Sequence, residues 1–210
     1  MRIRAHLIGF SLLGLIAAGW SSTGARAGDL TDLLWPAGAP ESRIDADGHA
    51  LSAEALRDRI AVVSFVSAGC ALPCAIRTMD LDRLARDLPQ TLRGRVVFLA
   101  VDTDPAADDA ARLRAFAESL VGPAPQLRFL PSDADATRAL AGALRYPASA
   151  LPEPPPTILL FDRRGQVAMT YGGDPVDAPR LARDIATLDT FTQGLGRPSA
   201  PAPGSSQPAR

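Results

Sequence analysis

Five runs of apolar residues along the chain predict the strands of a central sheet. Each run has the length of a strand and is bounded by polar residues, glycine or proline. The first two are almost continuously apolar, as expected for strands that are buried on both faces. The runs cover residues 60–66, 95–102, 126–130, 157–161 and 166–171.

Between these runs, apolar residues recur at the spacing of three and four that is typical of amphipathic helices. The first such segment has apolar residues at Ile76, Leu81, Leu84 and Leu88, and Pro89 ends it. A proline also opens the second segment, where its fixed φ suits the first helical turn. The predicted helices cover residues 75–88, 105–120, 133–144 and 178–190.

Strands and helices alternate until the last two strands, which a turn at residues 163–165 joins into a hairpin. Right-handed crossovers combined with one terminal hairpin predict an α/β fold with a mixed central sheet and helices on both of its faces. Ahead of the first core strand, residues 45–49 indicate a turn and residues 51–59 a short helical or irregular lead.

The amino-terminal residues have the composition of an export signal. Arg2 and Arg4 precede an apolar stretch over residues 7–20, and the small residues Ala25 and Ala27 form a cleavage motif. The stretch is shorter than the about 20 residues that a membrane-spanning helix needs. We therefore expect residues 1–27 to be a signal peptide and the protein to be periplasmic, with an inner-membrane anchor only if the signal is retained.

Composition sets the other boundaries. Residues 28–42 are expected to be a linker, residues 43–191 the folded domain, and residues 192–210, rich in Pro, Ser and Ala, a disordered tail. The chain has 22 basic and 23 acidic residues, and removing the signal leaves 19 against 23, a net charge of −4. This charge argues against a nucleic-acid partner.

The chain has two cysteines, Cys70 and Cys74, directly after the first core strand and directly before a predicted helix. The positive end of a helix dipole favours a thiolate, so the first cysteine is expected to be the more reactive one. Residues four apart on a helix have Cα atoms about 6 Å apart, a separation that a disulfide accepts. The spacing therefore predicts a dithiol that can close and open locally.

Three interpretations of this pair remain open on residues alone. A structural disulfide is compatible with export, although a bridge that closes so few residues constrains the unfolded chain little. In a redox pair, Cys70 would exchange with a partner and Cys74 would resolve the mixed disulfide. Two thiolates also suit Cu(I). Zinc is disfavoured, because it takes three or four protein ligands and the only histidine after the signal, His49, lies in a predicted turn.

Other candidate ligands have simpler explanations. Met79 and Met169 fit the apolar faces of a helix and a strand, which favours core packing over metal binding. An acidic run resembles a calcium loop but lacks the glycine and the closing glutamate of an EF-hand, so capping of the following helix is the better account. The run consists of Asp102, Asp104, Asp108 and Asp109.

Several of these motifs together resemble the SCO/SenC family, thioredoxin-fold proteins associated with copper-site assembly in cytochrome c oxidase. The resemblance spans about residues 43–190 and implies a thioredoxin-like fold. The matching residues are Asp47-Gly48 with Leu51 and Leu56, the Cys70-Ala71-Leu72-Pro73-Cys74 motif, residues 96–102, and residues 158–162 with Gly165.

One residue of the family pattern is missing. SCO proteins have a histidine ahead of the last hairpin, and alignment on Gly165 places Pro154 at that position, so the Cys-Cys-His copper site is incomplete. Pro156-Thr157 instead resembles the cis-proline and threonine that face the cysteines of thioredoxin and TlpA-type reductases. This second resemblance implies a cis Pro156 in contact with Cys70, and a protein-binding surface along residues 151–156.

The resemblance implies two alternative functions. The first is thiol-disulfide exchange with a cysteine-containing protein, such as a copper-site subunit of cytochrome oxidase, for which no cofactor is required. The second is a Cu(I) metallochaperone for the same oxidase, with Cys70 and Cys74 as the copper ligands. Only the first would make the protein an enzyme, a thiol-disulfide oxidoreductase.

Overall fold

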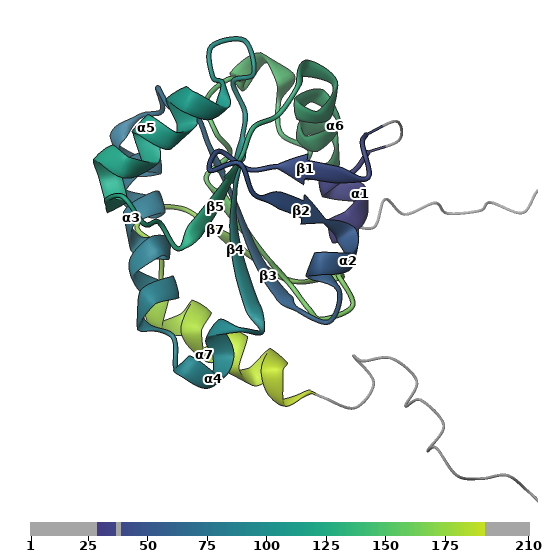
Figure 1. Cartoon of the computed structure of the whole chain (residues 1–210), viewed down its shortest axis with the longest axis vertical. Helices are drawn as coiled ribbons and strands as arrows, with labels where there is room; N and C mark the ends of the chain where they lie inside the picture. The colour runs from purple at the N-terminus through teal and green to yellow at the C-terminus, as the bar shows by residue number, and fades with distance from the viewer. Residues whose placement is uncertain (1–28, 37–38, 192–210) are drawn as a thin grey trace, which may run out of the picture.

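A five-stranded mixed sheet forms the centre of the computed structural model, which describes residues 29–36 and 39–191 (Figure 1). The strand order is β5-β4-β3-β6-β7. Strands β3, β4 and β5 are parallel, whereas β6 is antiparallel to both β3 and β7. This arrangement confirms the predicted mixed sheet. The strands are β3 (Ile60–Val66), β4 (Val96–Asp102), β5 (Leu127–Leu130), β6 (Thr157–Phe161) and β7 (Val167–Gly172).

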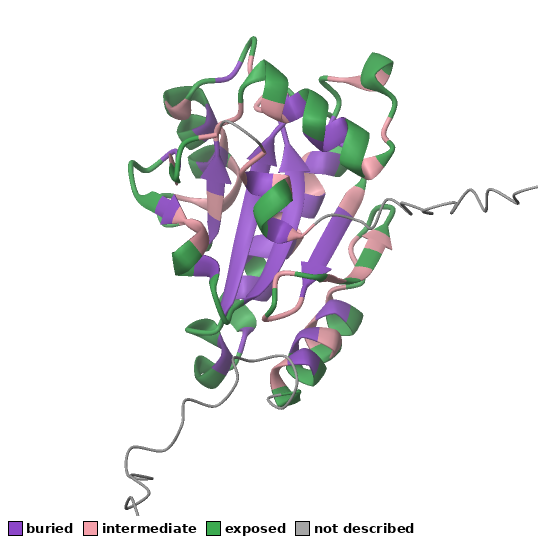
Figure 2. Cartoon of the chain, turned by 90° about the vertical axis from the view of Figure 1, so that its right-hand side faces the viewer, coloured by how far each residue is buried: buried purple, intermediate pink, exposed green. Residues whose placement is uncertain are grey.

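Helices cover both faces of the sheet, as predicted (Figures 1 and 2). One face packs against α3 (Leu72–Asp87), α5 (Ala110–Val121) and α7 (Ala178–Thr190). The opposite face packs against α1 (Leu30–Leu34), α2 (Ala53–Leu56) and α6 (Ala134–Leu144). Two short elements complete the connections, α4 (Gln90–Arg93) and the 3-10 turn η1 (Ala148–Ala150).

Strand β3 explains why the sheet has two cores. Its side chains alternate between the faces: Ile60 and Val62 belong to the α3-side core, and Ala61 and Val63 to the α1-side core. All seven residues of β3 are buried. A strand that is buried on both faces must lie inside the sheet, which is where β3 lies, between β4 and β6.

Boundaries differ from the sequence prediction in three places. Helix α3 begins at Leu72, because proline is tolerated in a first helical turn and Pro73 lies there. Helix α5 begins at Ala110, after a turn, with the Asp109 side chain accepting the amide of Arg112. The predicted turn at residues 45–49 joins a small hairpin that was not predicted, formed by β1 (Ser42–Ile44) and β2 (Ala50–Ser52).

Part of the expected linker is instead folded. Within residues 28–42, helix α1 has Leu30 and Leu34 at a spacing of four, and both are buried in the core. The Leu30 amide donates to the Gly165 carbonyl at 2.7 Å. Gly165 has a φ of +79°, and a Cβ there would lie 2.9 Å from Asp29 Oδ1, so glycine allows this close approach. The linker prediction is therefore wrong for this segment.

The expected signal peptide and tail, residues 1–27 and 192–210, lie outside the described residues. Within the described part of the chain, every helix is too short or too polar to span a membrane.

Helix α1 is expected to stabilise the domain. Leu34→Ala removes a side chain that is 1% exposed, so we expect the free energy of unfolding to fall by about 2–4 kcal/mol through lost burial and a cavity. Urea unfolding measures this loss. The matched control is Thr31→Ala on the exposed side of the same helix, and equal small losses for both variants would show that α1 contributes nothing to the core.

Candidate functional site

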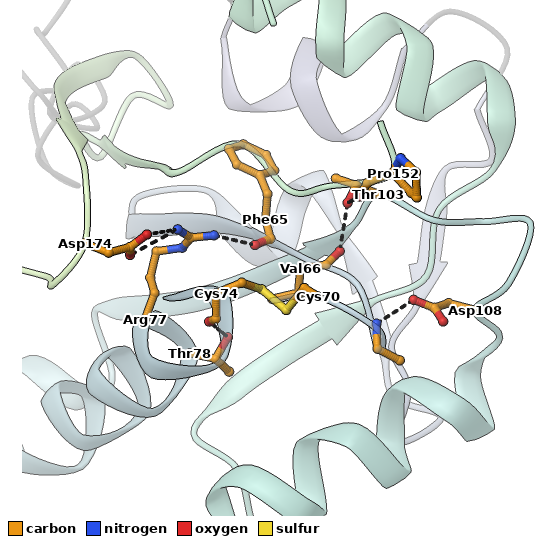
Figure 3. The surroundings of a disulfide bond; sticks show 11 residues. Phe65, Val66, Cys70, Cys74, Arg77, Thr78, Thr103, Asp108, Pro152 and Asp174 are labelled. Carbon is orange, nitrogen blue, oxygen red and sulfur yellow. Dashed lines mark hydrogen bonds and ion pairs between the residues drawn. A yellow bond between two sulfur atoms is a disulfide. The ribbon is translucent and has the colours of Figure 1, made fainter. Parts of the chain in front are cut away.

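Cys70 and Cys74 form a disulfide between the end of β3 and the start of α3 (Figure 3). Their Cα atoms are 6.0 Å apart, as the CxxxC spacing predicted. The loop that leads from β3 to Cys70 is a tight turn, in which the Cys70 amide donates to the Ser67 carbonyl at 3.1 Å. The pair therefore lies at the carboxyl edge of the parallel strands, where α/β folds commonly place their sites.

The two sulfur-bearing residues differ in exposure. Cys74 is 2% exposed and belongs to the α3-side core, whereas Cys70 is only partly buried. Between them, Ala71, Leu72 and Pro73 are all exposed, and Leu72 retains 70% of its accessible surface. Another protein can thus approach Cys70 over a small apolar surface while Cys74 stays covered.

The start of α3 favours negative charge at the cysteines. Helix α3 has 16 residues, and its N-cap, Ala71, has no side chain that could cap the first turn. Because the positive end of the helix dipole is uncompensated there, it stabilises a thiolate on the reduced pair. Cys74 is further fixed through its carbonyl, which accepts the Thr78 hydroxyl at 2.9 Å.

A buried ion pair lies next to the disulfide on α3 (Figure 3). The Arg77 side chain is 2% exposed, and Nη1 lies 3.2 and 3.1 Å from the two carboxylate oxygens of Asp174. Nη2 donates to the Phe65 carbonyl at 3.3 Å. Pairing of β3 with β6 ends at Val63. Arg77 thus joins α3, the end of β3 and the loop after β7 behind the cysteines.

A second polar connection joins β3 to the segment before β6. The Thr103 hydroxyl lies 3.1 Å from the Val66 carbonyl and 2.9 Å from the Pro152 carbonyl. Thr103 itself is 1% exposed. This contact holds the residues around Pro152 beside the end of the cysteine-bearing strand (Figure 3).

The predicted cis-proline is at a different position. Among the described residues, the cis peptide bonds are Leu151–Pro152 and Asp174–Pro175, so the prediction of a cis Pro156 is wrong. The Pro156 carbonyl instead accepts the Gly173 amide at 3.0 Å, which continues the β6–β7 pairing by one residue and requires extended backbone there. Pro156 is exposed. Because β6 is antiparallel to β3, its amino end still lies on the edge of the sheet where β3 ends.

Capping explains only part of the acidic run. Asp109 caps α5 as predicted, but Asp102 and Asp108 are 0% and 8% exposed, too buried for ordinary surface caps. Asp108 Oδ2 accepts the Ala68 amide at 2.6 Å, in the turn before Cys70 (Figure 3). Burial, together with the neighbouring Asp108 carboxylate, raises the pKa of Asp102 to about 6.

His49 lies in the turn before β2, as predicted, with a side chain that is 77% exposed. Its nearest carboxylates, Asp45 and Asp47, already pair with Arg128 and Arg114. Met169 packs against the α3-side core, and its sulfur lies 3.2 Å from the hydroxyl oxygen of Tyr171, which donates its hydrogen to Asp184 at 2.6 Å. These contacts account for both residues without a metal.

The donor set at the cysteines fits Cu(I) better than Cu(II). Over residues 29–36 and 39–191, one group of His, Cys, Asp and Glu side chains brings three ligand atoms within 4.8 Å of one another. This group consists of Asp45, Asp47 and His49, and neither cysteine belongs to it. After reduction, two soft thiolates remain, which suit Cu(I). Cu(II) would lack the additional nitrogen or oxygen donors that it prefers.

The contacts of the polar residues behind the cysteines were not predicted from the sequence. Arg77 had one available signal: it lies at the core-facing spacing of three and four from Cys74 and Leu81, where a lone charge requires a buried partner. The partner, Asp174, is 97 residues away, so no local pattern could identify it. Asp102 had a similar signal, because it ends an otherwise apolar buried strand.

Comparison with known proteins gives one family match. The model of the SCO1/SenC family matches residues 37–189. Among curated protein sequences, none matches this chain significantly.

Solved structures of Sco proteins share the fold. BsSco, a member of the Sco family of cytochrome c oxidase assembly proteins with an identified disulfide switch, is 17% identical with a TM-score of 0.56, over 71% of this chain and 91% of that chain. Bradyrhizobium japonicum ScoI with copper bound is 18% identical with a TM-score of 0.56, over 71% and 97%. Yeast Sco1 with copper bound is 17% identical with a TM-score of 0.59, over 74% and 93%. At these identities the likeness shows the fold.

The Arg77–Asp174 pair predicts an asymmetric response to mutation. Asp174→Ala leaves the buried guanidinium unpaired, so we expect the free energy of unfolding to fall by about 3 kcal/mol. Arg77→Met keeps most of the buried volume, and Asp174, whose side chain is 19% exposed, can turn toward water. We expect that loss to stay below about 1.5 kcal/mol in urea unfolding. A larger loss for Arg77→Met than for Asp174→Ala would contradict this account.

Proposed function

The chain belongs to the SCO1/SenC family, and we propose that it performs thiol-disulfide exchange during assembly of the copper site of cytochrome c oxidase. The observation that supports this proposal is the unequal exposure of a bonded cysteine pair at a helix start. A partly exposed Cys70 can react with another protein, and a buried Cys74 can resolve the product.

The exchange proceeds in two balanced steps. The Cys70 thiolate attacks one sulfur of a partner disulfide, which forms a mixed disulfide and releases the second partner sulfur as a thiolate. The Cys74 thiolate then attacks the Cys70 sulfur and releases the first partner sulfur. The partner gains two electrons and leaves as a dithiol, while this protein is oxidised to the Cys70–Cys74 disulfide.

A copper-site subunit is a suitable partner on chemical grounds. Cysteines bind metal as thiolates, so a copper site that has been oxidised to a disulfide must be reduced before loading. The Sco relative BsSco is described as an assembly protein of cytochrome c oxidase with a disulfide switch. The predicted export signal supports a periplasmic location, where disulfides persist.

Copper delivery is the second candidate function. It is favoured by one observation, that relatives of the same fold were crystallised with copper bound. The same thiolates would hold Cu(I) as cargo, without a histidine. This function would need a reduced pair, because sulfurs bonded to each other cannot act as thiolate ligands.

A disulfide-reduction assay, combined with a copper titration, separates the two functions. We expect the anaerobically reduced protein to reduce a disulfide-containing copper-site peptide with a rate that falls at least about 100-fold in Cys70→Ser, because the attacking sulfur is lost. We expect Cu(I) to bind only weakly, and Cu(II) more weakly still, in competition with a chelator. Cys74→Ser is the matched variant, which should trap the mixed disulfide.

Two results would contradict exchange as the function. One is tight, stoichiometric Cu(I) binding that prevents exchange, which would favour copper delivery. The other is a rate of exchange in Cys70→Ser equal to that of the wild type, which would remove Cys70 from the chemistry.

The missing histidine can be restored. Pro154 is buried in the segment between η1 and β6, at the position that alignment assigns to the family histidine. We expect Pro154→His to raise Cu(II) affinity by at least about tenfold, because Cu(II) gains from an imidazole where Cu(I) gains little. Equilibrium titration followed by visible absorption measures this change. Pro156→His, two residues along the same segment and exposed, is the control, and equal gains in both variants would show nonspecific coordination.

A further inference from the structure

Two buried carboxyl groups lie beneath the loop that leads to Cys70. Asp102 ends β4 and is 0% exposed, and Asp108 follows in the connection to α5 and is 8% exposed. The exchange steps described above use neither. Burying two carboxylates side by side is unfavourable unless protons or cations compensate them.

Asp108 is directly attached to the cysteine loop. Its Oδ2 accepts the Ala68 amide at 2.6 Å, a short distance for a charge-assisted bond. Ala68 precedes Cys70 by two residues, so their Cα atoms are at most about 7 Å apart. The other oxygen, Oδ1, lies 3.1 Å from Nε of Arg112 but has no aligned hydrogen bond.

Asp102 is less well compensated. Its Oδ1 accepts the Asp104 amide at 3.0 Å, and the Ser132 amide also bonds this carboxyl group. Its Oδ2 is buried without a hydrogen-bond partner. The charged groups that act on Asp102 are Asp108 itself and Arg43 from β1. Arg43 directs its donors to the carbonyls of Leu34 and Pro131, so it does not neutralise Asp102 directly.

We propose that Asp102 and Asp108 form a proton-sharing carboxyl pair that positions the cysteine loop and adjusts the reactivity of Cys70. A single proton on Asp102 gives a hydrogen-bond donor to two buried carboxyl groups that each have an oxygen without a hydrogen bond, Asp108 Oδ1 being compensated only by its ion pair with Arg112. Asp108 then stays an anion and keeps its bond to the Ala68 amide. This inference rests on the proposed function, since it concerns the reactivity of the same thiol.

The charge of the pair acts on the thiol in a defined direction. When Asp102 loses its proton, a second negative charge appears under the loop. A nearby like charge disfavours the thiolate and raises the pKa of Cys70. The pKa of Asp102 is raised to about 6, so this change occurs between about pH 5 and pH 7. At a given pH, a larger fraction of Cys70 is therefore the reactive thiolate while Asp102 is protonated.

Alkylation of the reduced full chain tests the pair without any partner or copper. We expect the pH profile of the iodoacetamide rate at Cys70 to show an inflection near pH 6 in addition to the titration of the thiol. Asp102→Asn keeps a donor toward Asp108 but cannot ionise, so its profile should lack that inflection and its rate at pH 7 should be roughly threefold to tenfold higher. Asp87→Asn, an exposed aspartate at the end of α3, removes the same charge and should match the wild type.

Asp108 variants test positioning separately from charge. Asp108→Ala removes the acceptor of the Ala68 amide, and we expect a broader, slower alkylation profile. Asp108→Asn retains an acceptor oxygen and should restore the rate, with the inflection moved to lower pH because Asp102 loses a neighbouring negative charge. An Asp102→Asn profile that superimposes on the wild type would overturn the proposal. That result would leave thiol exchange intact, because Cys70 would still react.

Stability gives a second measurement that does not depend on reactivity. The folded chain holds the Asp102 proton more tightly than the unfolded chain, whose carboxyl has its ordinary pKa near 4. The contribution of Asp102 to stability is therefore lost as pH rises from about 4 to about 6. We expect the urea midpoint of the wild type to fall, relative to that of Asp102→Asn, across this window and then to stay constant. A constant difference between the two from pH 4 to pH 7 would also overturn the proposal.

Discussion

The parallel pairing of β3 with β4, in the register that places Val66 opposite Asp102, is the constraint on which the site depends. Because both strands end at the same edge of the sheet, the loop that carries Cys70 and the loop that carries Thr103 and Asp108 must meet there. The Thr103 amide and hydroxyl both reach the Val66 carbonyl, which fixes this junction. The pairing in turn depends on two strands whose residues are all buried, so the hydrophobic cores on both faces hold the register.

Polar groups behind the cysteines are few, and nearly all their donors and acceptors are used. Arg77 is paired with Asp174 and a strand carbonyl, and Asp108 holds a loop amide. A buried ion pair adds little stability compared with apolar packing, but it penalises alternative arrangements in which either charge is unpaired. We therefore interpret Arg77 as a residue that selects one position for the loop after β7 against α3. Asp102 and Asp108 are the exceptions, because each has a buried oxygen without a hydrogen bond, and this allows the site to respond to pH.

Local patterns were sufficient for the sheet and the cysteine loop, because burial on both faces and the helix start leave direct marks on the sequence. Strand β3 and helix α7 have the predicted bounds. Nonlocal contacts were not predictable in this way. The cis bond at Pro152 rather than Pro156, the docking of α1 against Gly165, and the Arg77–Asp174 pair all depend on segments far apart in the sequence. Composition suggested a linker at residues 28–42, yet two leucines one turn apart were enough to fold α1 onto the sheet.

The same two sulfurs cannot exchange disulfides and hold copper at one moment. Oxidation consumes both thiolates in the Cys70–Cys74 bond, and Cu(I) occupies the pair that exchange would need. A third ligand would favour the metal, and Pro154, which alignment places where the resemblance implies a histidine, has no donor to offer. With only two sulfurs available, any group that stabilises the thiolates assists both reactions, whereas a ligand assists copper alone. The buried carboxyl pair offers copper no ligand and acts only through its charge, so its protonation favours the thiolates without selecting between their two uses.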